Sequence, residues 1–167
     1  MSELDTKLQR IDELLRNNGV EALLLNKVSS FAWATCGAAS YVNTAATDGA
    51  ASLLITPRGR FVITNNIEAP RIEKEEQLGN QGWQIRADPW YGAQNAVAEL
   101  VGGYSLGADG PYPNAKDLSA EISRLRSRLL PEERERFRSL GRKCAEIMDQ
   151  AIRAVKPGMS EYQIASL

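Results

Sequence analysis

The sequence predicts an α/β fold of three layers, α/β/α, with a mixed sheet in the middle. Residues 20–26 form a nearly continuous apolar run, which is typical of a strand covered on both faces. Residues 51–64 contain two apolar, β-branched runs around Pro57-Arg58-Gly59, which predicts a hairpin. Helical patterns then alternate with further apolar runs, and helical crossovers make the connected strands parallel.

The first helix is expected to begin at Ser2, because Ser2 and Asp5 are spaced as in a capping box. Asn18-Gly19 suits a left-handed cap at its end. The apolar face of this helix consists of Leu4, Leu8, Ile11 and Leu15.

Between the first strand and the hairpin, residues 28–37 are expected to form a short helical turn or a strand. Phe31 and Trp33 in this segment are interpreted as core and rim packing. Residues 37–49 are rich in Ala, Ser, Thr and Asn, and are expected to be a loop that returns to the hairpin.

The pattern continues in the same alternation after the hairpin. The expected elements are a helix from Pro70 to about Leu78, a strand at residues 82–87, a helix at about 92–101, a strand at 104–109 and a helix at about 114–129.

A long amphipathic helix is expected from Pro131 to about Val155, where Pro157-Gly158 ends it. Ser160-Glu161-Tyr162-Gln163 then has the form of a capping box. We therefore expect one α/β domain at residues 1–130, and at residues 131–167 a linker helix with the first residues of a second domain. Because the apolar stripe of the long helix needs a cover, we expect a homodimer that buries Phe137, Leu140, Ile147, Met148 and Ile152.

Composition excludes several kinds of function. The net charge is −1, which gives no electrostatic reason to expect nucleic acid or an anionic membrane. The chain contains no histidine, which excludes Ser-His and Cys-His nucleophiles and zinc sites that need imidazole. No run is long enough to span a membrane, and no signal pattern is present. Cys36 and Cys144 are far apart in sequence, so we expect reduced thiols in a cytoplasmic protein.

One alternative from the residues alone is a carboxylate enzyme. Asp48, Asp88 and Asp109 fall near expected strand ends, and converging carboxylates can bind Mg²⁺ and cleave phosphodiesters. Asp88-Pro89 and Asp109-Gly110-Pro111 are, however, ordinary turn sequences without a basic patch. We therefore assign no catalytic residue and no metal ligand to this chain.

Several short strings occur in an order that resembles the amino-terminal domain of the creatinase, prolidase and aminopeptidase P superfamily, the pita-bread metallopeptidases. Phe31-Ala32-Trp33-Ala34-Thr35-Cys36-Gly37 stands where the family often has a Tyr-Leu-Thr-Gly-like string. The segment 154–165 resembles the Pro-Gly-Met-Thr-Glu stretch near the start of the family's catalytic domain. The other matching strings are Asn18-Gly19 before the first strand, Glu68 and Arg71 after the hairpin, Asp88-Pro89-Trp90 and Gly107-Ala108-Asp109.

The resemblance implies a ribonuclease-H-like α/β fold and a role in an X-prolyl aminopeptidase or prolidase. It places the family's two divalent metals (Mn, Co or Zn) and their Asp, His and Glu ligands beyond the matched segment, so this chain alone is expected to bind no metal and hydrolyse no peptide. The family's domain supports dimer contacts and lends a loop to the rim of the substrate cleft, which points to Tyr41 and Asn43. The Arg-x-x-Lys-Ser string that usually precedes the family's last long helix has no match at residues 129–134. The alternative is therefore a stand-alone protein-interaction module from an inactive relative.

Overall fold

The computed structural model describes residues 2–93 and 95–167. The chain divides into two compact units, one that ends at Arg128 and one that spans Leu129–Leu167.

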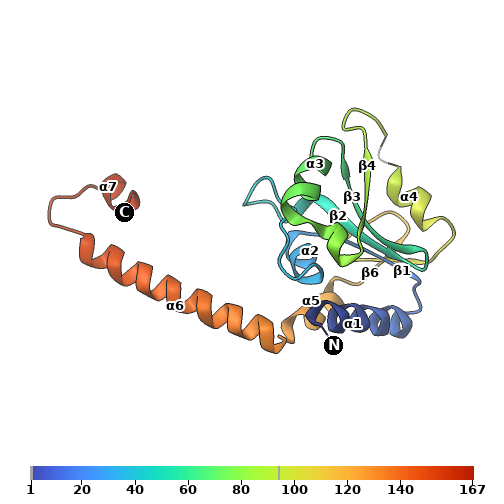
Figure 1. The fold of residues 1–167 in the computed structure, drawn as a ribbon, viewed down its shortest axis with the longest axis horizontal. Coiled ribbons are helices and arrows are strands. Elements are labelled where there is room, and N and C mark those ends of the chain that lie inside the picture. Colours follow the sequence, from blue (N-terminus) through green and yellow to red (C-terminus); the bar gives the residue numbers. More distant parts are fainter. Residues whose placement is uncertain (1, 94) are drawn as a thin grey trace. The chain divides into compact units, whose positions relative to one another are not determined.

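The first unit is built on a six-stranded sheet in the order β4-β3-β2-β1-β5-β6 (Figure 1). β2 is antiparallel to both of its neighbours, and all other neighbouring strands are parallel. This mixed sheet confirms the predicted fold class. The strands are β1 (Ala22–Lys27), β2 (Asp48–Thr56), β3 (Gly59–Asn65), β4 (Gln84–Asp88), β5 (Leu106–Ala108) and β6 (Ala115–Asp117).

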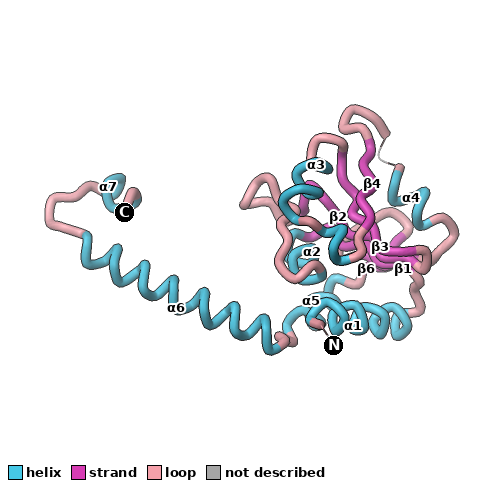
Figure 2. Tube along the Cα trace, in the orientation of Figure 1, coloured by secondary structure: helices cyan, strands magenta, loops and turns pink. Residues whose placement is uncertain are grey.

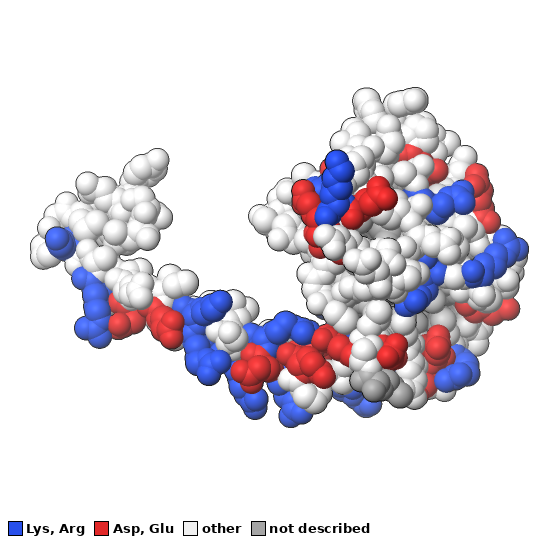
Figure 3. Space-filling model, viewed as in Figure 1, with Lys and Arg blue, Asp and Glu red and all other residues white. Residues whose placement is uncertain are grey.

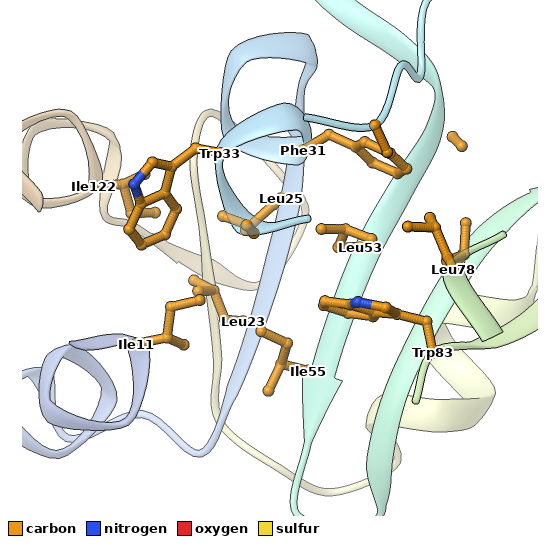
Figure 4. Close-up of a cluster of buried hydrophobic side chains, with 14 of the residues drawn as sticks. Ile11, Leu23, Leu25, Phe31, Trp33, Leu53, Ile55, Leu78, Trp83 and Ile122 are labelled. Atoms are coloured by element: carbon orange, nitrogen blue, oxygen red, sulfur yellow. The ribbon is translucent and has the colours of Figure 1, made fainter. Parts of the chain in front are cut away.

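Three helices and a buried cluster cover one face of the sheet. The helices are α1 (Glu3–Asn18), α2 (Val28–Ala34) and α5 (Ser119–Ser127). Because side chains alternate along a strand, Leu23 and Leu25 of β1 point into this cluster. Figure 4 shows them packed between Ile11 of α1, Trp33 of α2 and Ile122 of α5. Phe31 and Trp33 are both buried, as predicted.

The opposite face has a thinner cover. Leu24 of β1, Leu54 of β2 and Phe61 of β3 form a second buried cluster there. Ala96 and Val101 of α4 (Ala96–Val101) pack against it. The sheet is thus enclosed on both sides, which gives the three predicted layers.

The predicted helix at residues 114–129 is wrong in its first part. Asn114 has a positive φ of 57°, and residues 115–117 pair with β5 as the edge strand β6. The helix α5 begins only at Ser119, whose N–H donates to Asp117 Oδ1 at 2.9 Å. Leu118 is fully buried between the strand and the helix. Its apolar side chain therefore belongs to the core and not to the apolar stripe of a helix.

Two other predicted helices are shorter than expected. The segment after Pro70 consists of α3 (Ala69–Arg71), a π-helical turn (Ile72–Glu76) and a 3₁₀ turn (Leu78–Gln81). The helical path breaks because Gln77 is left-handed, with a φ of 49°. The helix expected at 92–101 begins at Ala96, and Gln94 within that range lies outside the described residues.

The second unit contains α6 (Pro131–Ala154) and α7 (Glu161–Ala165), both of which are cyan in Figure 2. At the start of α6, the Leu130 N–H donates to Glu133 Oε2 at 2.8 Å. Ser160 and Gln163 form the predicted capping box of α7. In the part of the chain that the structure describes, no helix combines the length and apolar character needed to cross a bilayer.

Candidate functional site

The carboxyl ends of the five mutually parallel strands lie at one edge of the sheet, where β2 begins. In open α/β sheets this edge commonly binds ligands. Two grooves of about 360 and 220 Å³ lie here, and both are lined by Asn26 and Ser52. The other principal polar residues that line them are Lys27, Asp48 and Asp109 in the larger groove and Asp88 in the smaller one.

Asp109 closes the gap where β1 and β5 separate. Its side chain is buried, and its two carboxylate oxygens accept the N–H groups of Asn26 (2.8 Å) and Lys27 (3.0 Å). Its own N–H donates to the carbonyl of Leu24 at 3.2 Å. A carboxylate with two such bonds from the backbone has a clear role in holding two strands together.

Lys27 and Asp48 form an ion pair at the mouth of the larger groove. Lys27 Nζ lies 2.9 Å from Asp48 Oδ1, and the two residues are register partners of β1 and β2. The hydrogen bond to Asp48 raises the pKa of Lys27, and the charge of Asp109 acts in the same direction. The pair is partly exposed to solvent, so it contributes little to stability but fixes a cation and an anion beside the groove.

Asp88 is held separately. Its Oδ2 accepts the N–H of Ala96 at 3.0 Å, which ties the end of β4 to the start of α4. The structure therefore brings Asp48 and Asp109 together around Lys27 and leaves Asp88 in the neighbouring groove. Across residues 2–93 and 95–167, no three His, Cys, Asp or Glu side chains are grouped so as to hold a metal ion. The three aspartates of the magnesium hypothesis thus do not line one common groove.

Tyr41 and Asn43 lie on the loop between α2 and β2, at the same edge of the sheet. The loop is anchored at its base, because the N–H groups of Val28 and Ala50 donate to the carbonyls of Thr47 (3.0 Å) and Ser40 (2.7 Å). Its tip is exposed, including both residues and Val42. Asn43 Oδ1 accepts the N–H of Ala45 at 2.9 Å, so this side chain shapes the tip.

Three apolar side chains at this edge were missed from the sequence. Ile67 follows β3, Trp90 and Tyr91 follow β4, and all three are more than half exposed. Asn66 joins the two loops, since its Oδ1 accepts the Trp90 N–H at 2.9 Å. The Trp90 and Tyr91 rings meet edge to face, with centroids 5.8 Å apart.

We call these three residues the apolar rim. Figure 3 shows few charged side chains on the loops at this end of the unit. The available signal in the sequence was an aromatic pair in a turn between Pro89 and Gly92. An aromatic pair held in a tight turn cannot enter the core easily, which accounts for the exposure of Trp90 and Tyr91.

Comparison with known proteins gives a consistent result for the fold. No protein-family model matches the sequence, and no curated protein matches it either. Among solved structures, a Xaa-Pro dipeptidase from Bacillus anthracis matches 98% of this chain and 47% of its own, at 18% identity and a TM-score of 0.66. The prolidase from Pyrococcus horikoshii OT3 matches 96% of this chain and 46% of its own, at 15% identity and a TM-score of 0.69.

A third solved structure consists of an N-terminal domain alone. The N-terminal domain of a Xaa-Pro dipeptidase from Lactobacillus brevis is covered over 98% of its length by 71% of this chain, at 12% identity and a TM-score of 0.51. The chain spans about half the length of the first two enzymes. It therefore has the fold of a prolidase-type N-terminal domain, as the resemblance predicts.

Proposed function

We propose that this chain is the non-catalytic N-terminal domain of an X-prolyl aminopeptidase or prolidase-like metallopeptidase, where it supports dimerisation and shapes the substrate cleft. The observation that carries the proposal is the exposed set of loops at one edge of a prolidase-type fold. Tyr41 and Asn43 lie on a loop that is anchored at its base, and the apolar rim lies on the loops that follow β3 and β4; an α/β scaffold commonly presents contact residues on such loops. The reactive metals, two divalent ions, are proposed to be bound by residues that follow Leu167.

The chemistry of the edge fits a rim rather than a reaction centre. Asp109 and Asp88 are engaged by backbone N–H groups, and Lys27 is paired with Asp48. Exposed aromatic side chains, by contrast, can cover an apolar part of a peptide such as a proline ring. We also propose a reducing, cytoplasmic location, because Cys36 and Cys144 stand far apart in the sequence.

Kinetics of the natural protein test the cleft role. If its gene continues past Leu167 with the Asp, Asp, His, Glu, Glu ligand set, Trp90→Ala and Tyr41→Ala should each raise KM for an X-Pro peptide about three- to tenfold. Gln9→Ala on α1 is the matched control, because Gln9 is exposed and its side-chain amide donates to Glu13 of the same helix. Unchanged KM in both aromatic variants would overturn the cleft role.

The chain of 167 residues is itself expected to be inactive. Purified chain with Mn²⁺, Co²⁺ or Zn²⁺ and an X-Pro peptide should release no amino-terminal residue. Turnover that persists through further purification would contradict the proposal. If the gene instead stops at Leu167, the same exposed loops favour the second candidate, a protein-interaction module.

A further inference from the structure

Asn66 lies at the point where β3 and β4 both end. The two strands lie side by side and run parallel (Figure 1), with Asn65 opposite Asp88 in the register. The Asn66 N–H donates to the carbonyl of Asp88 at 3.0 Å, which extends the ladder one residue beyond the last register pair. The sheet therefore fixes the backbone of Asn66, and its side chain starts from a defined position.

The side chain of Asn66 continues the ladder where the backbone of the neighbouring strand cannot. Pro89 follows β4 and has no N–H to donate. The next donor along the chain is the Trp90 N–H, which lies 2.9 Å from Asn66 Oδ1. Asp109 acts in a similar way at the ends of β1 and β5, where it accepts two N–H groups. Asp109 is buried and joins strands of the core, whereas Asn66 is exposed and holds a residue with a large exposed ring.

The position of the aromatic pair depends on its backbone, because the core does not hold the two rings. Trp90 and Tyr91 are 61% and 76% exposed, and their rings meet at an interplanar angle of 88°. A turn closes around them, since the Gly92 N–H donates to the Pro89 carbonyl at 3.1 Å. The Asn66 side chain ties this aromatic turn to the loop that follows β3.

We propose that Asn66 is a positioning residue, which sets the direction of the Trp90 and Tyr91 rings through its hydrogen bond to the Trp90 N–H. The inference rests on the proposed function, in which these rings contact the peptide at the rim of the cleft. A ring that is already held in place loses little freedom on contact, so the peptide binds more tightly. Asn66 itself need not touch the peptide. Loss of its hydrogen bond should therefore weaken peptide binding and leave the bond-breaking step unchanged.

Amide exchange in the chain itself tests the hydrogen bond. Asn66→Ala removes the acceptor and should speed exchange of the Trp90 N–H, measured by NMR, about three- to tenfold. Asn66→Asp keeps an acceptor oxygen at the same place and should restore the slow exchange. Asn80→Ala is the matched control, because Asn80 is an exposed asparagine whose amide donates to Gln77 within its own turn. Equal exchange of the Trp90 N–H in wild type and Asn66→Ala would overturn the proposal.

Kinetics of the natural protein test the consequence for the peptide. Asn66→Ala should raise KM for an X-Pro peptide about threefold with kcat unchanged, and Asn66→Asp should return KM close to the wild-type value. A merely structural loss would instead reduce the amount of folded enzyme, and would lower the apparent kcat without a change in KM.

A background without the two rings separates this inference from the cleft role. When Trp90→Ala and Tyr91→Ala are both present, Asn66→Ala should have no further effect on KM, because no ring remains to be positioned. A further rise of KM in that background would overturn the inference. An unchanged KM in Asn66→Ala alone, when Trp90→Ala raises KM, would also overturn it and leave the cleft role standing. An unchanged KM in Trp90→Ala would instead overturn the cleft role, and the exchange of the Trp90 N–H then decides for or against Asn66.

Discussion

At the scale of single residues, buried polar groups of the α/β unit join backbone segments that the apolar core alone would leave unpaired. Lys7 is buried, and its Nζ donates to Glu3 Oε1 (2.7 Å) and to the carbonyl of Trp33 (2.8 Å), which joins α1 to α2. Asp109 joins β5 to β1 in the same way. Neither role is visible in the sequence, because the partners are a backbone carbonyl and two backbone N–H groups far away along the chain.

Asp109→Ala should lower the free energy of unfolding by about 2–3 kcal/mol, because two N–H groups at the end of β1 lose their acceptor. Asp109→Asn retains one acceptor oxygen and should cost about half as much. Urea unfolding followed by circular dichroism measures both. An Asp109→Ala chain as stable as the wild type would show that the carboxylate is dispensable for the fold, and would return it to the list of functional candidates.

The acid response of α1 should depend on Ser2. The side-chain hydroxyl of Ser2 hydrogen-bonds to Asp5, as does its backbone N–H, and these bonds lower the pKa of Asp5. A lowered pKa in the folded state stabilises the helix start above the unfolded pKa, and this contribution is lost as the pH falls through the folded pKa. Ser2→Ala should raise the pKa of Asp5 toward its ordinary value in an NMR titration. The pKa of Asp117, which the Ser119 N–H lowers, is the internal control and should not change.

At the scale of elements, helices and strands could be predicted from the sequence where a single periodic pattern determined them. The hairpin at residues 51–64 and the helix from Pro131 have strong periodicity and clear ends, and both form. The predicted secondary structure was wrong where tertiary contacts outweigh the local preference of the sequence. Residues 115–117 become β6 because β5 offers a free edge, and the segment after Pro70 breaks at Gln77 because Ile72 and Leu78 are both drawn into the core.

The candidate site was predicted only in part. Tyr41 and Asn43 do lie on an exposed loop at the carboxyl edge, but Trp90 and Tyr91 were passed over because a strand-ending turn carries no periodicity. Which aspartates meet around Lys27 depends on strand order, and local sequence does not determine strand order.

The junction of β5, β6 and α5 depends on a glycine. A Cβ added to Gly107 would lie 2.5 Å from Leu118 Cδ1 and 3.4 Å from Val20 Cγ2. Gly107→Ala should therefore cost about 1–3 kcal/mol through overpacking of the buried Leu118. A double-mutant cycle with Leu118→Val provides the control, because the shorter side chain should recover part of the loss. If the free-energy costs of the two substitutions simply add, the strain does not arise from contact between the new Cβ and Leu118.

At the scale of the whole molecule, the core and the proposed interfaces are separated along the chain. Both buried clusters, including the residues packed against them, are drawn from positions up to Leu125. The second unit carries an exposed stripe instead of a core of its own. This division leaves the buried core in the first unit and an exposed apolar stripe in the second.

A chain that ends at Arg128 should therefore fold without the second unit. Because it retains every member of both clusters, its free energy of unfolding should fall by less than about 1 kcal/mol, within the range expected for peripheral changes. If the full chain forms the dimer through α6 that its sequence leads us to expect, the shortened chain should be monomeric at the same concentration. Urea unfolding gives the first quantity and sedimentation the second. Loss of cooperative unfolding in the shortened chain would show that α6 is part of the core, whereas a shortened chain that folds and still dimerises would move the interface to the α/β unit.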